Sequence, residues 1–129
     1  MLDNFKVEII SPESLILDTN ASEVVLPSYE GEIGILKDHI SLVTFLRPGV
    51  IKIKGETEKN FFVEDGTVEF SNNTLLVLTS TAKQLSKIDK NLSKDIIKDA
   101  EKKLINNELT DKEKYLLAYK IDTLKKIIQ

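Results

Sequence analysis

The sequence contains no cysteine and no tryptophan, and it has a single histidine, His39, and a single arginine, Arg47. Without cysteine the chain can form no disulfide, no thiolate metal site and no cysteine nucleophile. One histidine supplies too few ligands for a histidine-based metal site, and the acidic residues do not follow the spacing of a calcium-binding loop. We therefore expect no metal ion and no cofactor.

Long apolar runs are also missing, because no stretch approaches the roughly 18 residues that a membrane-spanning helix needs. The first ten residues, MLDNFKVEII, lack the basic segment and the apolar run of a secretory signal. The composition, 41% hydrophobic and 30% charged, is typical of a folded globular chain. We expect a protein that would meet a membrane only through a larger complex.

Charge is distributed unevenly along the chain. Residues 1–82 carry six Lys or Arg and thirteen Asp or Glu, whereas residues 83–129 carry twelve Lys and eight Asp or Glu. The resulting charges of −7 and +4 sum to the formal net charge of −3. An acidic front and a basic back indicate two units with different neighbours, although ordinary solvated helix faces would give the same pattern.

Short apolar segments with a period of two dominate the chain up to about residue 82. Phe5, Val7 and Ile9 alternate with polar residues, which places one side of a strand in a core. Further strands are expected at 15–17, 24–26, 50–54, 61–63, 68–70 and 75–78. We interpret Asp65-Gly66 as the turn of a β-hairpin. Many short strands with regular turns predict a β-sandwich or flattened barrel.

After residue 85 the period changes to that of amphipathic helices. Two apolar stripes are expected, one formed by Leu92, Ile96, Ala100 and Leu104 and the other by Leu117, Ile121, Leu124 and Ile128. Asn91 or Ser93 is expected to cap the first helix, and Thr110 with Glu113 matches a capping box for the second. The short connection predicts an antiparallel helical hairpin.

The predicted fold is therefore mainly β plus α, with an N-terminal β-sandwich over residues 1–84 and a C-terminal helical hairpin over residues 85–129. Two helices of this size bury little apolar surface on their own. The hairpin must therefore pack on the sandwich or on a partner, which makes it a candidate moving part.

The sequence patterns of catalytic sites are not found. His39 follows Asp38 directly, and adjacent strand residues point to opposite faces, so a Ser–His–Asp triad is not expected. Glu30 and Glu32 could share a face as a glycosidase pair does, although solvated glutamates beside a turn are commoner. No phosphate-binding GxxxxGK[ST] segment occurs, and the basic helices offer few aromatic rings for stacking on bases. We expect a noncatalytic interaction protein without a nucleic-acid partner.

The segment VVLPSYEGEIGILKDHISLVTFLRPGVIKI, residues 24–53, resembles the signature of the epsilon subunit of F-type ATP synthases. The positions that stand at its spacing are Gly31, Glu32, Gly34, Ile35, His39, Leu42, Thr44, Leu46, Pro48 and Gly49. Residues 7–13 and 61–82 are similar to two further segments of the family, so the likeness extends over nearly the whole chain. Lys37, Ser41 and Asp65 depart from the pattern, and all three are compatible with turns.

This resemblance implies a noncatalytic central-stalk subunit. Such a subunit turns with the gamma subunit and the ring of c subunits, and it helps to couple proton translocation to ATP synthesis. Its hairpin would either fold onto the sandwich or extend toward the catalytic beta subunits and inhibit ATP hydrolysis. The implied location is peripheral, at the cytoplasmic face of the bacterial inner (plasma) membrane.

The resemblance also implies that the loop 30–35, with His39 on the following strand, docks on the c-ring, while other sandwich contacts go to gamma. The interface candidates are Glu30, Gly31, Glu32, Ile33, Gly34 and His39. Glycines would permit close approach, and acids would provide complementarity. The alternative is a loop whose glycines and acids serve only its own turn, with a histidine at its rim.

The hairpin offers two further expectations. The basic residues Lys98, Lys102, Lys103, Lys125 and Lys126 would attract the acidic C-terminal segment of the beta subunit, with a solvated helix face as the alternative. Some bacterial members bind ATP through I/L-D-x-x-R-A. Here Ile88-Asp89 matches the first two positions, but Leu92-Ser93 stands where Arg-Ala would. Lysine does not reproduce the bidentate grip of arginine on phosphate, which leaves Asp89 as the one candidate ATP contact.

A second hypothesis belongs to a different class. The chain could be a free-standing cytosolic β-sandwich adaptor that binds an acidic protein through its helical tail. Co-purification with gamma would separate the two hypotheses. An enzyme that uses Glu30 and Glu32 is a third and more distant one.

Overall fold

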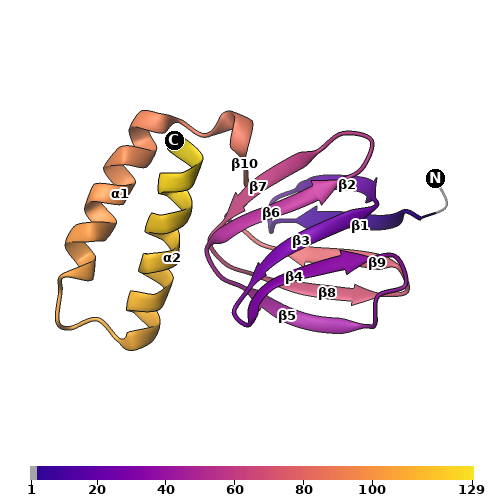
Figure 1. Ribbon diagram of the computed structural model, residues 1–129, viewed down its shortest axis with the longest axis horizontal. Coiled ribbons are helices and arrows are strands. Elements are labelled where there is room, and N and C mark those ends of the chain that lie inside the picture. The colour runs from indigo at the N-terminus through magenta and orange to yellow at the C-terminus, as the bar shows by residue number, and fades with distance from the viewer. Residues whose placement is uncertain (1–2) are drawn as a thin grey trace.

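The computed structural model describes residues 3–129, and within them it contains ten strands, one 3-10 helix and two α-helices. Figure 1 shows the strands as a sandwich and the helices as an antiparallel pair beside one of its ends. The predicted fold class, a β-sandwich followed by a helical hairpin, is confirmed.

The ten strands occupy the chain up to residue 84. Their bounds are β1 (Phe5–Ile10), β2 (Leu15–Ala21), β3 (Glu23–Ser28), β4 (Gly31–Leu36), β5 (Leu42–Leu46), β6 (Gly49–Lys54), β7 (Lys59–Val63), β8 (Gly66–Ser71), β9 (Thr74–Leu78) and β10 (Lys83–Gln84). They form one path in the order β10-β7-β6-β3-β5-β8-β9-β1-β2, with β4 paired to β3. All pairings are antiparallel except that of β1 with β9, which is parallel.

The path of strands folds over where β3 meets β5. These two strands share one residue pair, Ser28 with Leu46. Beyond it, β3 pairs with β4 and β6 in one layer, and β5 pairs with β8 in the other. The Ser22 amide donates to the Lys54 carbonyl at 2.7 Å, which continues the β3–β6 ladder one residue beyond the Glu23–Lys54 pair. The sandwich is therefore a flattened barrel.

The inward side chains of the strands fill the interior of this barrel. They are the alternate apolar residues that the period of two predicts, including Phe5, Val7, Ile9, Val24, Leu26, Ile51, Ile53, Val68, Phe70, Leu75 and Val77. Each is at most 2% exposed. A complete core of this kind makes the sandwich a rigid platform for whatever its surface binds.

The predicted hairpin at Asp65-Gly66 is wrong. Strand β7 pairs with β6 and β10, whereas β8 pairs with β5 and β9, so the turn carries the chain from one layer to the other. The Asp65 carbonyl accepts a hydrogen bond from the Thr79 hydroxyl at 2.7 Å, which fixes this corner. A local turn signal cannot distinguish a hairpin from a crossing, because pairing depends on strands far away in the sequence.

The two helices begin at side-chain caps. Helix α1 (Lys90–Leu104) is capped by Asp89, whose carboxylate accepts from the amides of Asn91 and Leu92 at 2.8 and 3.2 Å. The expected caps, Asn91 and Ser93, are therefore wrong, since the chain is still extended at Asp89 and helical after it. The capping box of Thr110 is confirmed at the start of helix α2.

Helix α2 (Asp111–Ile128) follows a short connection. A 3-10 helix, η1 (Leu85–Lys87), joins β10 to α1. Neither helix within residues 3–129 combines the length and apolar character required to cross a bilayer.

The hairpin packs on the sandwich through Phe62. This side chain lies on the outward face of β7 and is buried in a second apolar cluster with Ile97, Ala100, Ile121 and Leu124. The stripe predicted for α1 is confirmed at Ile96, Ala100 and Leu104, which lie in or against this cluster. It is wrong in the first turn, where Leu92 is 52% exposed and Ser93 is 3% exposed. The stripe predicted for α2 is confirmed, with Leu117 and Ile128 packed against the same cluster.

The corner at Gly66 leads to a prediction about stability. Its φ of +151° is unfavourable for other residues, and a Cβ there would lie 2.8 Å from the Leu78 carbonyl oxygen and 3.0 Å from Thr79 Cβ. Gly66→Ala should lower the free energy of unfolding by about 1–3 kcal/mol in urea denaturation. Gly34→Ala is the matched control, because its Cβ would come no closer than 3.9 Å to Glu23 Oε2, and we expect a change within about 0.5 kcal/mol. Equal stabilities of the two variants would contradict the steric argument.

Candidate functional site

The six predicted interface residues do not form one patch. Glu30 lies in the turn between β3 and β4, at the end of the sandwich beside α2 (Figure 1). His39 follows β4 and lies in the connection to β5, not on a strand as expected. Strand β4 has six residues, so at about 3.3 Å per residue its two ends are roughly 17 Å apart. The sequence places Glu30 and His39 nine positions apart, but the extended strand between them separates their surfaces.

The turn at Glu30 is held by its own hydrogen bonds. The buried Ser28 hydroxyl donates to the Gly31 carbonyl at 2.7 Å and accepts from the Glu30 amide at 3.1 Å. Gly31 has a φ of +115°, which other residues rarely adopt. The need for glycine at Gly31 is therefore explained by the turn itself, without a partner.

Strand β4 divides the other candidates between its two faces. Ile33 points inward and packs against the sandwich core, whereas Glu32 and Gly34 are exposed on the outer face. Of the candidates in this segment, Glu30 and Glu32 are thus the exposed charged groups available to a partner.

His39 belongs to the far end of the sandwich. Its Nδ1 lies 2.7 Å from the Ile40 carbonyl oxygen, and its ring meets Phe70 edge-on at a centroid distance of 6.0 Å. Asp38 and Asn73 fix the turn around it. The Asp38 backbone amide donates to Asn73 Oδ1 at 2.6 Å, and Asn73 Nδ2 donates to Asp38 Oδ1 at 2.9 Å. This geometry fits a histidine that closes the rim of the core.

The five candidate lysines of the hairpin are all exposed, but their surroundings differ. Three are in ion pairs: Lys103 with Asp99 at 3.4 Å, Lys125 with Glu101 at 3.2 Å and Lys126 with Asp122 at 3.2 Å. Within residues 3–129 no ion pair involves Lys98 or Lys102. These two lie one turn apart on α1 and are the lysines with the least local neutralisation.

The surroundings of Asp89 do not fit a nucleotide. A cavity of about 320 Å³ lies between Asp89 and the sandwich, and its lining includes Lys120. The Asp89 carboxylate is already engaged as the cap of α1, and Lys120 pairs with Glu64 at 2.8 Å. No arginine lines this cavity. Residues 3–129 also hold no group of three acidic or histidine side chains suited to a metal ion.

An apolar groove is the main surface that sequence reasoning missed. Strand register places five residues in one row across the outer face of the second layer: Phe45, Thr67, Leu78, Ile10 and Leu15. Phe45 and Leu78 are 60% and 46% exposed. The groove at this row has a volume of about 1270 Å³. One signal could have revealed it: LVTFL at 42–46 and LLVL at 75–78 are apolar at nearly every position, as strands covered on both faces are.

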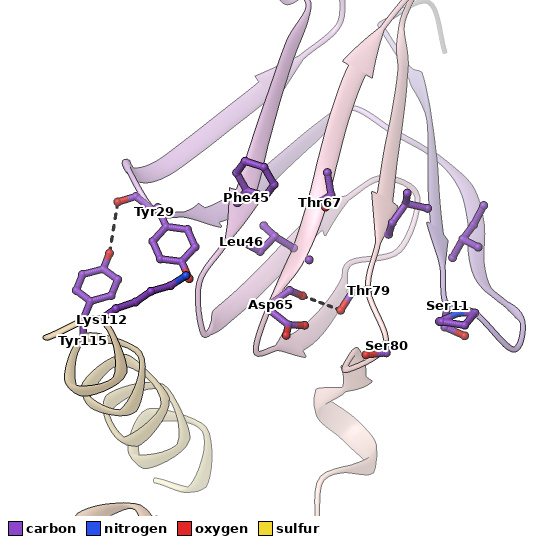
Figure 2. A pocket seen from close by; sticks show the side chains of 14 residues that line it. Ser11, Tyr29, Phe45, Leu46, Asp65, Thr67, Thr79, Ser80, Lys112 and Tyr115 are labelled. Atoms are coloured by element: carbon purple, nitrogen blue, oxygen red, sulfur yellow. Dashed lines mark hydrogen bonds between the residues drawn. The ribbon is translucent and has the colours of Figure 1, made fainter. Parts of the chain in front are cut away.

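The folded hairpin supplies one wall of this groove, as Figure 2 shows. Lys112 and Tyr115 from α2 face Tyr29 from the β3–β4 turn. The rings of Tyr29 and Tyr115 are stacked at a centroid distance of 5.8 Å, and the Tyr115 hydroxyl donates to the Tyr29 carbonyl at 3.4 Å. Burial, together with neighbouring Tyr119, raises the pKa of the Tyr115 hydroxyl above its ordinary value of 10.0.

This contact leads to a prediction about pH. Because the folded contact favours the neutral phenol of Tyr115, the stability that it contributes is complete below pH 10.0 and falls as pH rises through the raised pKa. Titration of the tyrosinate absorbance should contain a component above pH 10.0 that Tyr115→Phe removes. Circular dichroism across the same range would check that the sandwich stays folded. Because Tyr115→Phe removes one of the three tyrosines, the total absorbance change must fall. A remaining curve with the same shape and midpoint as that of the unmodified protein would contradict the raised pKa of Tyr115.

A family model described as the ATP synthase, Delta/Epsilon chain, beta-sandwich domain matches residues 4–85. The chain is 49% identical over 127 residues to the ATP synthase epsilon chain of Pelagibacter ubique (strain HTCC1062), covering 97% of this chain and 98% of that one. It is 34% identical over 109 residues to the chloroplastic ATP synthase epsilon chain of Gracilaria tenuistipitata var. liui, covering 84% and 81% of the two chains.

Solved structures agree on the fold. A chain in the Euglena gracilis mitochondrial ATP synthase superposes with a TM-score of 0.81 at 16% identity, covering 98% of this chain and 82% of that one. A chain in the central stalk and c-ring of the Tetrahymena thermophila enzyme gives 0.67 at 18% identity, covering 96% of both. The sandwich, the hairpin and the near full-length relatives lead to one conclusion: the chain belongs to the epsilon-subunit family of ATP synthases.

Proposed function

We propose that this noncatalytic epsilon-type subunit serves in the central stalk of an F-type ATP synthase, turning with gamma and the c-ring. The observation that carries the proposal is the 49% identity to an ATP synthase epsilon chain over 97% of the chain. Its contribution is mechanical: a rigid sandwich bound to other rotor subunits transmits rotation without chemistry of its own.

The apolar groove is the proposed docking face for gamma. Phe45 and Leu78 are among the large apolar side chains exposed on the sandwich, and they lie together in this groove. A contiguous exposed apolar surface commonly marks a protein interface. Its apolar centre and its border of Asp65 and Lys112 match the usual composition of an interface core and rim.

Glu30 and Glu32 are the proposed contacts with the c-ring. Both are exposed beside a turn that its own hydrogen bonds make rigid. Rigid placement lowers the entropy cost of docking, and exposed acids favour a complementary basic or polar surface. We assign structural roles to Gly31 and Ile33 in the turn and the core, and to His39 at the far rim.

Docking on gamma and docking on the c-ring can be tested separately. Phe45→Ala should weaken binding to purified gamma by about 5- to 30-fold, because a large apolar contact is lost. Glu32→Lys should leave gamma binding unchanged but weaken attachment of the assembled stalk to the c-ring. Each variant is the control for the other. Surface plasmon resonance measures binding to gamma, and co-sedimentation measures attachment to the c-ring. If Phe45→Ala binds gamma normally, the groove is not the docking face; if neither form binds gamma at all, the adaptor hypothesis replaces the stalk role.

The hairpin is the proposed brake on ATP hydrolysis. Here it is folded on the sandwich, and its second apolar cluster is shallower than the sandwich core, with Phe62 at 6% and Ile121 at 8% exposure. Release of this cluster would let the helices extend along gamma toward the beta subunits, as a second packing of the same elements. Lys98 and Lys102 are the proposed contacts with acidic residues of beta.

The brake can be tested by truncation. A chain that ends at Lys87 keeps β10 and η1 and removes both α-helices. The catalytic head assembled with this chain should hydrolyse ATP faster than the head assembled with the full chain. The amount of the truncated chain in the purified head is the control for assembly, because the truncation also removes Lys112 and Tyr115 from the wall of the groove. Equal hydrolysis rates after normal assembly would mean that the hairpin is no brake.

The same assay tests the role of the lysines. Lys98→Glu with Lys102→Glu should relieve inhibition, more so at low salt, because exposed charges are screened beyond about 8 Å at physiological ionic strength. Lys103→Glu with Lys126→Glu is the matched control, since it makes the same change of net charge at lysines that are already in ion pairs. If the two double variants had equal effects, Lys98 and Lys102 would be ordinary solvated residues of a helix face and not contacts with beta.

We also propose that the complex holds the protein at the cytoplasmic face of a bacterial plasma membrane. The support is the bacterial origin of the relative at 49% identity. Cell fractionation in which gamma sediments with membranes while this chain stays in the supernatant would contradict this location.

A further inference from the structure

Every tyrosine of the sequence and its only arginine meet at one place between the sandwich and α2. Tyr115 stacks on Tyr29, and its other edge meets Tyr119 at a centroid distance of 4.8 Å and an interplanar angle of 64°. The Arg47 guanidinium carbon lies 3.9 Å from the centre of the Tyr119 ring. The four side chains form a continuous series of contacts in the order Tyr29, Tyr115, Tyr119 and Arg47.

The two ends of this series belong to the sandwich, and its middle belongs to the hairpin. Tyr29 lies in the β3–β4 turn, where its amide donates to the Phe45 carbonyl at 3.2 Å. Arg47 lies in the β5–β6 turn, where its amide donates to the Pro27 carbonyl at 3.0 Å. Tyr115 and Tyr119 are one turn apart on α2 and therefore share a face. Two fixed turns thus hold one helix face between them.

The Arg47 side chain is committed to this position. Its guanidinium donates to the Pro48 carbonyl at 3.2 Å, and its Nε atom is buried without a hydrogen-bond partner in the part of the chain that the structure describes. A cation held over an aromatic face gains electrostatic attraction that increases as water is excluded. The guanidinium lies over the ring of Tyr119. This contact exists only while the hairpin is folded onto the sandwich.

These contacts are separate from the apolar cluster at Phe62. None of the four residues belongs to that cluster, which instead uses side chains such as Ile97 and Leu124. Apolar burial tolerates sliding, because it has no direction, whereas stacking and cation–π contacts require a particular geometry. The aromatic series therefore fixes where the helix lies, and it is lost as a unit when the helix leaves.

We propose that Tyr29, Tyr115, Tyr119 and Arg47 form a latch that sets the balance between the folded and released positions of the hairpin. The proposal deepens the proposed function, because it identifies the contacts that hold the inhibitory hairpin on the sandwich. It rests on that function only for the link to ATP hydrolysis. The latch itself is a property of the isolated chain.

The test measures the position of the hairpin in the full-length protein without partners. Spin labels at Glu56→Cys, in the β6–β7 connection, and at Glu108→Cys, in the connection between the helices, would report it by electron–electron double resonance. Both sites are exposed, and the chain has no native cysteine to compete for label. Arg47→Gln and Tyr119→Leu should each raise the ratio of released to folded hairpin by about 5- to 30-fold, as expected for loss of one or two such contacts.

Two control variants separate a latch from general destabilisation. Lys52→Gln removes a cation that borders the same side of α2 but contacts no ring, and it should leave the ratio unchanged. Tyr119→Phe keeps the ring and should behave as the unmodified protein. Circular dichroism of the sandwich should be the same in all variants.

The double variant Arg47→Gln with Tyr119→Leu provides the decisive comparison. If the two residues act on each other, the double variant should release the hairpin less than the product of the two single effects. Single variants that leave the ratio unchanged, or single effects that multiply fully, would overturn the latch. Released hairpins with unchanged ATP hydrolysis would instead refute the brake and leave the latch standing.

Discussion

The two C-terminal helices carry more apolar surface than they can bury against each other, and the arrangement of the molecule depends on that constraint. Their shared stripe is covered by Phe62, which points outward from β7. A phenylalanine on the outer face of a strand would expose its ring to water unless another element covered it, and that exposure is unfavourable. Each part therefore completes the other, and Phe62 determines on which face of the sandwich the hairpin packs.

The two apolar clusters differ in a way that suits their roles. The sandwich core is sealed, with residues such as Val7 and Ile9 at 0% exposure, so this part resists deformation. The cluster under the hairpin is smaller and less sealed, and directional contacts of Tyr119 and Arg47 lie beside it. Elements that move are drawn from the less stable parts of a protein. A rigid platform with a hairpin packed on it through a smaller apolar cluster fits the proposed roles of transmitting rotation and restraining ATP hydrolysis.

The apolar groove illustrates how a surface arises from both the sandwich and the hairpin. Phe45 on β5 and Leu78 on β9 both pair with Thr67 on β8, and this register places them in one row. Tyr115 then adds a wall from a helix far along the chain. The acids at the β3–β4 turn lie beside this groove and not at the far rim with His39, so the proposed contacts with gamma and with the c-ring are neighbours at one end of the sandwich.

Local patterns in the sequence were sufficient for most of the strands, the two helices, the capping box at Thr110 and the resemblance to the epsilon family, because each depends on residues close together in the chain. They did not reveal β4, since residues 30–35 were expected to form a loop. They were not sufficient for the crossing at Asp65-Gly66, the cap at Asp89 or the separation of Glu30 from His39. They also did not indicate that Arg47 would meet Tyr119 at the end of a series of three tyrosines. Alternation records which side chain faces a core, but not which strand lies beside it or what covers its outer face. Those relations are decided by contacts between distant segments, and only the tertiary structure contains them.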